Sequence, residues 1–331
     1  MKKAQFFLVL FLSVMLFAGC IFNENGDNEP ELIIEPPETA GIEGFSFDNL
    51  PRIDGSTSCR HLNTMIACKL LHRPYYWQEP AIMTEWQVFP VREALTDNEY
   101  AIFTERVKTS QTHGAFVNLI DGAADIILTH RTLSPDEAEY ARSKGVSLIE
   151  TPVAADAFVF VVNINNPVKS LTVNQVRQIY TGEITNWAQV GGQNAEMKVY
   201  TRPRNSGSEE VMRELVMGGL EMAEFSESSI GQMSWVFTEV IENDNAICYT
   251  FNNYKELIMR TYDAVVPRIA INGVFPDETT VKDETYPFIS KVNVAVRSDL
   301  DHNSMAYRMF EWLQSANAKP VYEECGFVGM Q

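Results

Sequence analysis

Short apolar runs alternate with amphipathic stretches along most of the chain. Between the apolar runs, apolar side chains recur at helical spacing, as in residues 173–180, where Thr172 supplies an N-cap and Gly182 a stop. A further amphipathic helix is predicted from Ser304. The runs that predict buried strands are residues 124–128, 157–162, 246–249 and 292–296. This alternation predicts an α/β fold with mainly parallel strands.

The first twenty residues have the pattern of a targeting segment. Two lysines precede an almost wholly apolar stretch, residues 6–17, which is too short to span a bilayer. We therefore interpret residues 1–20 as a signal peptide. Residues 16–20 read Leu-Phe-Ala-Gly-Cys and resemble the lipobox of bacterial lipoproteins, with Phe in place of the usual Leu or Val. The resemblance implies a diacylated Cys20 that anchors the chain to a membrane. The alternative is an ordinary secretory signal in which Cys20 is incidental.

Residues 21–45 differ in composition from the rest of the chain. They are acidic and rich in proline, and they offer little apolar surface to bury. This composition predicts a flexible, solvated tether. The remaining part of the chain, about 285 residues, is long enough for one large or two medium α/β domains.

The net charge limits the class of partner. At −18 it argues against nucleic acid, because phosphate backbones require clustered Lys and Arg. It does not exclude a small anion, because salt screens charges beyond a Debye length of about 8 Å, so the local site decides. No cofactor motif is present. Four cysteines follow Cys20, and their spacing matches no zinc pattern and fixes no disulfide connectivity. They are Cys59, Cys68, Cys248 and Cys325.

Hydroxyl residues and glycine stand directly before a predicted amphipathic helix at three places in the chain. These three helix mouths are residues 54–58, 110–114 and 205–208, and Arg202 lies four residues before Ser206. A helix N-terminus has unpaired N–H groups and about half a positive charge, so it attracts anions. Hydroxyls and a guanidinium can add donors to the same anion. The alternative is that all three segments are ordinary helix caps.

A longer motif decides between these interpretations. Residues 171–187 read LTVNQVRQIYTGEITNW, and Val190-Gly191-Gly192 follows. These segments, together with the arginine and Ser-Gly-Ser of residues 202–208 and the strand at residues 246–249, resemble the phosphate-binding proteins of ABC phosphate importers. That family lies within the type 2 periplasmic binding superfamily. The resemblance extends from about Leu50 to the C-terminus.

The resemblance implies a two-lobed α/β fold, with each lobe a mainly parallel sheet flanked by helices and a hinge between them. Residues 46–153 and 266–331 would form one lobe, and residues 154–265 the other. The protein would be a monomeric, extracytoplasmic lipoprotein that delivers inorganic phosphate, or a related tetrahedral oxyanion, to an ABC permease. By position, the implied ligand-binding residues are Thr57, Ser58, Thr112, His130, Arg202, Ser206, Gly207 and Ser208.

His130 departs from the family pattern. Many relatives have an aspartate at this position, which accepts the proton of a protonated phosphate, whereas residues 125–131 here read DIILTHR. A histidine would not repel a fully ionised oxyanion. We therefore expect weaker discrimination between phosphate and other tetrahedral oxyanions, or a preference for the dianion. His61 and His113 also fall near the expected cleft and raise a metal site as an alternative, although no metal-ligand spacing is present.

Two other functions are consistent with the same residues. One is a ligand-sensing lipoprotein with no transport role. The other is a phosphoester-processing enzyme that would use Ser58 or Ser206 with His113 or His130. We expect no enzyme, because the chain contains neither a Gly-x-Ser-x-Gly elbow nor a Gly-x-x-x-x-Gly-Lys loop.

Overall fold

The computed structural model describes residues 33–34, 41–78, 85–225 and 229–330. The predicted signal peptide with Cys20, and most of the predicted tether, lie outside these ranges. Every helix within them is too short or too polar to cross a membrane.

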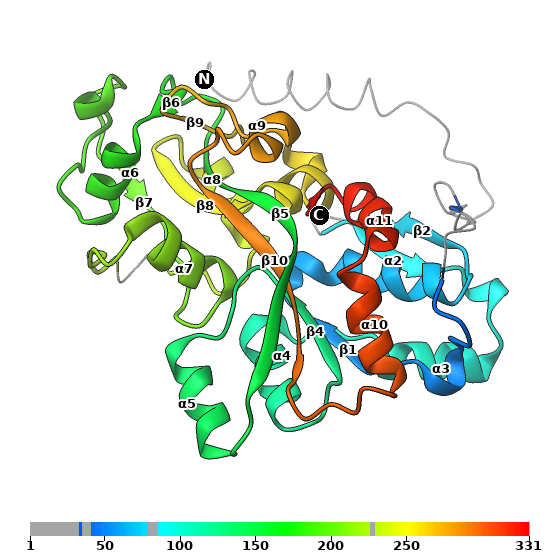
Figure 1. Ribbon diagram of the computed structural model, residues 1–331. Coiled ribbons are helices and arrows are strands. Elements are labelled where there is room, and N and C mark those ends of the chain that lie inside the picture. The colour runs from blue at the N-terminus through cyan, green and yellow to red at the C-terminus, as the bar shows by residue number, and fades with distance from the viewer. Residues whose placement is uncertain (1–32, 35–40, 79–84, 226–228, 331) are drawn as a thin grey trace, which may run out of the picture. The chain divides into compact units, whose positions relative to one another are not determined.

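One mixed sheet organises the described chain (Figure 1). The strands are β1 (Ile53–Gly55), β2 (Tyr75–Gln78), β3 (Gln87–Pro90), β4 (Ile126–Thr129), β5 (Leu148–Val162), β6 (Ser170–Leu171), β7 (Lys198–Val199), β8 (Ala246–Phe251), β9 (Ala270–Ile271), β10 (Ile289–Arg297) and β11 (Val328–Gly329). The main sheet has the order β1-β4-β10-β5-β8-β7, and β11 pairs with β5. Two short pairs, β2–β3 and β6–β9, stand apart from it.

The α/β class predicted from the sequence is confirmed, but the strand directions differ in part from the expectation. In the main sheet only β1–β4 and β7–β8 are parallel pairs. The long strands β5 and β10 run antiparallel to each other and to their other neighbours. The sheet is therefore mixed, because β10 enters from the C-terminal part of the chain between β4 and β5.

Helices flank this sheet. They are α2 (Arg60–Leu70), α3 (Asp97–Arg106), α4 (Gln111–Ile120), α5 (Pro135–Ser143), α6 (Val173–Tyr180), α7 (Gly207–Val211), α8 (Trp235–Glu242), α9 (Glu278–Lys282), α10 (Met305–Leu313) and α11 (Lys319–Glu324). The caps predicted for α6 are present: Thr172 accepts a hydrogen bond from the Gln175 N–H, and Gly182 follows the helix with a φ of 81°. A single π-helical turn, Met212–Met217, extends α7.

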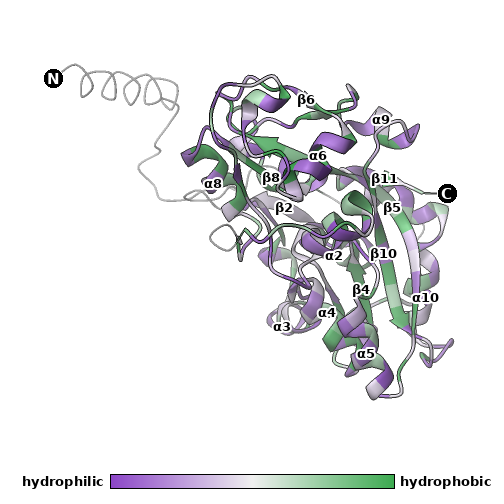
Figure 2. Ribbon diagram, turned by 90° about the vertical axis from the view of Figure 1, so that its left-hand side faces the viewer, coloured by the Kyte–Doolittle hydropathy of each residue, from purple (hydrophilic) through white to green (hydrophobic). Residues whose placement is uncertain are grey.

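The apolar side chains gather into two main cores, one at each end of β5 and β10. Ala157–Val162 of β5 pack with β8, α6 and α8, whereas Val292, Val294 and Val296 of β10 pack with α2, α10 and α11. Ile127 faces a smaller cluster beneath α4. Figure 2 shows β4, β5, β8 and β10 as the apolar interior of the described chain. Each core belongs to one lobe, and β5 and β10 connect them.

The change from one core to the other along β10 lies close to a β-bulge. The register of β10 against β5 shifts between Val292 and Asn293. Apolar residues between 266 and 288 pack in the core that contains β8. Those from Val292 onward pack in the core that contains α2. The first lobe was expected to resume at residue 266. The residues that return to the core of this lobe begin later in the chain, at Val292. The four cysteines after Cys20 are buried and unpaired.

Gly55, at the end of β1, has no room for a side chain. An added Cβ would lie 2.5 Å from the Leu128 carbonyl oxygen and 2.9 Å from Asn63 Nδ2. We predict that Gly55→Ala lowers the free energy of unfolding by about 2 kcal/mol, because overpacking forces the backbone to move. Gly231→Ala is the matched control, since its Cβ would meet nothing within 4 Å. Denaturant unfolding measures both variants, and equal stability of the two would contradict the prediction.

Candidate functional site

The first helix mouth follows β1. The chain leaves β1 at Gly55 and turns into a 3-10 helix, Thr57–Cys59, that continues directly into α2. Asp54 is buried behind this turn, and its Oδ1 accepts hydrogen bonds from the N–H groups of Gly55 (2.7 Å) and Ser110 (2.8 Å). Ser56 and Ser58 share a hydrogen bond at 3.1 Å. The buried Asp54 carboxylate therefore binds the backbone of this helix mouth on its buried side. The Ser56 and Ser58 hydroxyls stay on the opposite side.

The second helix mouth is tied to the first through the same carboxylate. Ser110, before α4, donates its N–H to Asp54, and the Asn118 side chain donates to Asp54 Oδ2 at 2.7 Å. Gln111, the first residue of α4, has a φ of 64°, which is uncommon for a residue other than glycine. This turn brings the buried Thr112 to the wall of a cavity. Asp54 thus fixes two mouths relative to each other.

The third helix mouth belongs to the other lobe. Ser206 caps α7 by accepting the N–H of Glu209, and Gly207 and Ser208 follow. An added Cβ on Gly207 would lie 2.6 Å from Thr112 Oγ1, so only glycine permits this approach between the lobes. The Arg202 N–H donates to the Tyr249 hydroxyl at 3.0 Å and to Glu209 Oε2 at 3.2 Å. These bonds fix the backbone from which the Arg202 side chain extends.

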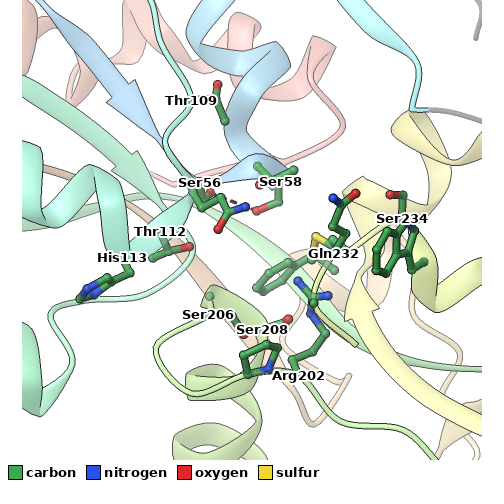
Figure 3. A pocket seen from close by; sticks show the side chains of 18 of the residues that line it. Ser56, Ser58, Thr109, Thr112, His113, Arg202, Ser206, Ser208, Gln232 and Ser234 are labelled. Carbon is green, nitrogen blue, oxygen red and sulfur yellow. Dashed lines mark hydrogen bonds between the residues drawn. The ribbon is translucent and has the colours of Figure 1, made fainter. Parts of the chain in front are cut away.

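The three mouths open into one cavity of about 680 Å³. In Figure 3, Ser56, Ser58 and Thr112 lie on one side of it, Arg202, Ser206 and Ser208 on another, and Gln232 and Ser234 complete the wall. Seven of the eight ligand-binding residues predicted from the sequence line this cavity; they are Thr57, Ser58, Thr112, Arg202, Ser206, Gly207 and Ser208. Their roles toward a ligand stay predictions.

Other lining residues were not identified from the sequence. The segment before α8 and its first turn contribute Gln232, Ser234, Trp235 and Thr238. Gly231 and Ser234 stand directly before α8, as glycine and serine stand before the other helices, and this pattern is the signal by which the sequence could have identified the segment. The resemblance did not include these residues. Only the folding of α8 against β8 brings this segment to the cavity.

Arg202 is the central charge of the site. Only 8% of its surface is exposed, and its Nη1 donates to the Ile230 carbonyl at 2.6 Å. Its Nε is buried and has no hydrogen-bond partner among the described residues. Burial lowers its pKa from the usual value, because the charged form is held away from water. A buried guanidinium at the wall of the cavity is a strong electrostatic reason for an anion to enter it.

His130, the eighth predicted residue, lies behind the cavity wall and does not line it. Its Nδ1 lies 2.8 Å from Ser58 Oγ, and its ring stacks on Phe251 with the centroids 3.9 Å apart. Its Nε2 is 3.4 Å from Asp156 Oδ2, at ion-pair distance. Burial by itself lowers the pKa of a histidine, but Cys59 and Asp156 outweigh it and raise the pKa of His130 to about 9. The protonated ring donates to Ser58, so the Ser58 hydroxyl can donate toward the cavity.

A second buried cation joins the lobes at one edge of the cavity. Arg131 forms a two-point ion pair with Glu137, with N–O distances of 2.6 and 2.8 Å. Its Nη2 also donates to the Asn205 carbonyl at 2.9 Å, and the Asn205 side chain donates to Asp136 at 3.0 Å. Burial disfavours the charged form of Glu137, but its hydrogen bonds and the Arg131 charge lower its pKa. We call these four residues the lobe bridge.

The other histidines do not converge on a common centre. His61 is buried, with Nε2 3.2 Å from the Cys325 carbonyl oxygen. His113 lines the cavity, and its Nδ1 lies 2.9 Å from Glu137 Oε1. Among the residues that the structure describes, no group of three or more His, Cys, Asp or Glu side chains is arranged to hold a metal ion.

Comparison with known proteins gives consistent matches. A family model described as a PBP superfamily domain matches residues 89–315. Protein SphX of Synechococcus elongatus is 26% identical over 256 residues, which cover 73% of this chain and 74% of that protein. The phosphate-binding protein PstS of Borreliella burgdorferi is 24% identical over 214 residues, which cover 62% of this chain and 72% of that protein.

Solved structures match along nearly all of their length. An ABC-type phosphate transport receptor from Vibrio cholerae is 25% identical with a TM-score of 0.56, and the match covers 84% of this chain and 99% of the receptor. A putative phosphate ABC transporter substrate-binding protein from Clostridium perfringens, solved with bound phosphate, has a TM-score of 0.60 at 20% identity. That match covers 84% of this chain and 98% of the other, and it shows the shared fold.

We predict that His130 makes the stability of the protein depend on pH. Its folded pKa of about 9 lies above the ordinary histidine pKa of 6.5, so its protonation stabilises the fold below pH 6.5, and this contribution is lost as the pH rises through about 9. The free energy of unfolding should fall by about 3 kcal/mol across this range relative to His130→Gln. His302→Gln, on the surface, is the control. Denaturant unfolding at pH 6.5, 8 and 9.5 tests this, and parallel pH profiles for the protein and His130→Gln would refute it.

Proposed function

This chain belongs to the PBP superfamily, and we propose that it captures phosphate, or a related tetrahedral oxyanion, and delivers it to an ABC importer. The proposal includes anchoring through Cys20 on the extracytoplasmic face of the cell membrane, and action as a monomer. The lipobox-like sequence of residues 16–20 supports the anchor. The relatives, which include a phosphate-binding protein and an ABC-type phosphate transport receptor, support the ligand and the partner.

The observation that carries the proposal is the buried Arg202 among three helix mouths. Arg202 has an unpartnered buried Nε, and the surrounding hydroxyls belong to Ser58, Thr112, Ser206 and Ser208. Hydrogen bonds to a charged group contribute about 1.5–3 kcal/mol each. A micromolar dissociation constant corresponds to about 8 kcal/mol. A few of these donors acting together therefore suffice after the cost of desolvating the anion.

The arrangement favours binding over catalysis. A nucleophilic Ser58 would need a neighbouring base, and His130 is a titratable group within hydrogen-bond distance of its hydroxyl, at 2.8 Å. With its pKa raised to about 9, His130 carries a proton at neutral pH and cannot accept another. A phosphoester release assay tests this directly, and turnover that depends on Ser58 would favour an enzyme.

We predict that Arg202→Gln weakens phosphate binding by at least tenfold, because it removes the charge that a buried anion would neutralise. Arg142→Gln, at an exposed position on α5, is the matched control and should bind like the unaltered protein. Isothermal titration calorimetry with inorganic phosphate measures both variants. Unchanged affinity of Arg202→Gln, with its fold intact by circular dichroism, would contradict the assignment of the site.

We also predict that sulfate competes with phosphate. Arg202 and the hydroxyls of the three helix mouths can donate to an anion, and Glu85, the carboxylate that lines the cavity in the described chain, is paired with Arg60 and Tyr254. His130 occupies the position where many relatives have an aspartate. A fully ionised anion therefore meets no repulsion there. The ratio of the two dissociation constants should lie within about tenfold at pH 6 and at pH 8 by calorimetry. A large, pH-independent preference for phosphate would be the opposite result.

A further inference from the structure

The cavity is much larger than an anion bound at its inner end, which we define as the end formed by Arg202, Gly207 and Thr112. Its volume is about 680 Å³. A tetrahedral oxyanion has five heavy atoms and displaces roughly three water molecules, or about 100 Å³. Cavities of about 300–1,000 Å³ are typical of sites for whole organic molecules. Most of the volume therefore lies beyond the group that Arg202 would hold.

The large volume of the cavity does not result from a separation of the two lobes. The lobe bridge already joins them, with Arg131 and Asp136 of the first lobe bonded to Asn205 of the second. At the inner end, Gly207 lies so close to Thr112 Oγ1 that an added Cβ would be 2.6 Å from that oxygen. The cavity keeps its size while the two lobes are in contact.

A second part of the cavity, which we call the outer wall, is formed by Gln232, Ser234, Trp235 and Thr238. Its side chains suit a polar ring. Trp235 lines it with 55% of its surface exposed, which is unusual for so large an apolar side chain. The side chains of Gln232, Ser234 and Thr238 line the same wall and form no hydrogen bond with any other residue that the structure describes. An aromatic face beside free amide and hydroxyl groups suits a ring that carries hydroxyls.

The inner end suits an anion without a proton. Inorganic phosphate at neutral pH retains at least one P–OH group, which needs an acceptor. Glu85 is the one carboxylate that lines the cavity in the described chain, and both of its oxygens are engaged, by Arg60 at 2.9 Å and by the Tyr254 hydroxyl. A phosphate monoester has a second pKa of about 6, so at neutral pH its three terminal oxygens are mostly unprotonated. The Arg202 guanidinium and the hydroxyls of the inner end can donate to those three oxygens.

We propose, on the premise of the proposed function, that this cavity binds a sugar phosphate. The phosphoryl group lies at Arg202, and the sugar ring stacks on Trp235 with its hydroxyls bonded to Gln232, Ser234 and Thr238. The ester oxygen replaces the P–OH group for which the inner end has no free carboxylate. The same donors hold the phosphoryl group of the ester and inorganic phosphate.

Calorimetric titration of the intact protein with glucose 6-phosphate, inorganic phosphate and glucose tests the proposal. Glucose 6-phosphate should bind at least as tightly as inorganic phosphate, and each should displace the other. Glucose should bind far more weakly, because it lacks the charge. Phosphate binding with glucose 6-phosphate excluded, or more than 100-fold weaker, would overturn this inference and leave the proposed function intact. Binding of neither anion would overturn both.

Trp235→Ala separates the sugar contact from the phosphoryl contact. The variant should weaken glucose 6-phosphate about tenfold more than inorganic phosphate, because only the sugar loses its aromatic face. Phe275→Ala is the matched control, since Phe275 is an aromatic residue with 45% of its surface exposed that does not line the cavity. Equal weakening of both ligands by Trp235→Ala would show that the indole does not contact a sugar, and would overturn the proposed pose.

Discussion

The burial of the Arg202 guanidinium is the constraint around which the site is built. A buried cation is costly unless a partner compensates it, and among the described residues Arg202 has a carbonyl contact but also a free Nε. Despite this cost, the fold holds Arg202 in place, because its backbone N–H donates hydrogen bonds to Tyr249 and Glu209. The guanidinium is therefore held ready before an anion arrives, so less ordering remains to oppose binding.

Apart from Glu85, which lines the cavity, the carboxylates of the site stand behind the donors. Asp54 accepts N–H groups from two helix mouths, and Glu209 accepts the Arg202 N–H. Asp156 lies behind His130, and Glu137 binds Arg131 at the lobe bridge. Each acidic group orients a donor or a cation whose other side faces the cavity or its edge. A chain with a net charge of −18 can in this way present a cavity wall of donors to an anion.

The sequence was most informative where the site is local in the chain. Each helix mouth is a few adjacent residues before a periodic helix, so Thr57, Thr112 and Ser206 could be identified without knowing how the lobes meet. Two features depended on contacts between distant segments. Trp235 reaches the cavity only because α8 packs on β8, and the antiparallel course of β10 follows from a strand that returns late in the chain. His130 was predicted from its position in the family pattern. That position indicates that the residue lies near the site, but not whether its side chain lines the cavity or lies behind the cavity wall.

The two ends of the cavity differ in how firmly the fold fixes them. At the inner end, the contact of Gly207 with Thr112 and the lobe bridge set the distance between the lobes. Asn205 has a φ of 65°, a conformation that asparagine tolerates better than most residues, and its side chain binds Asp136 while its carbonyl binds Arg131. Among the residues that the structure describes, the outer wall around Trp235 forms no hydrogen bond of this kind with the first lobe. The inner end therefore determines which charged group can bind, and the outer wall is where a change of side chain can alter selectivity at little cost to the fold.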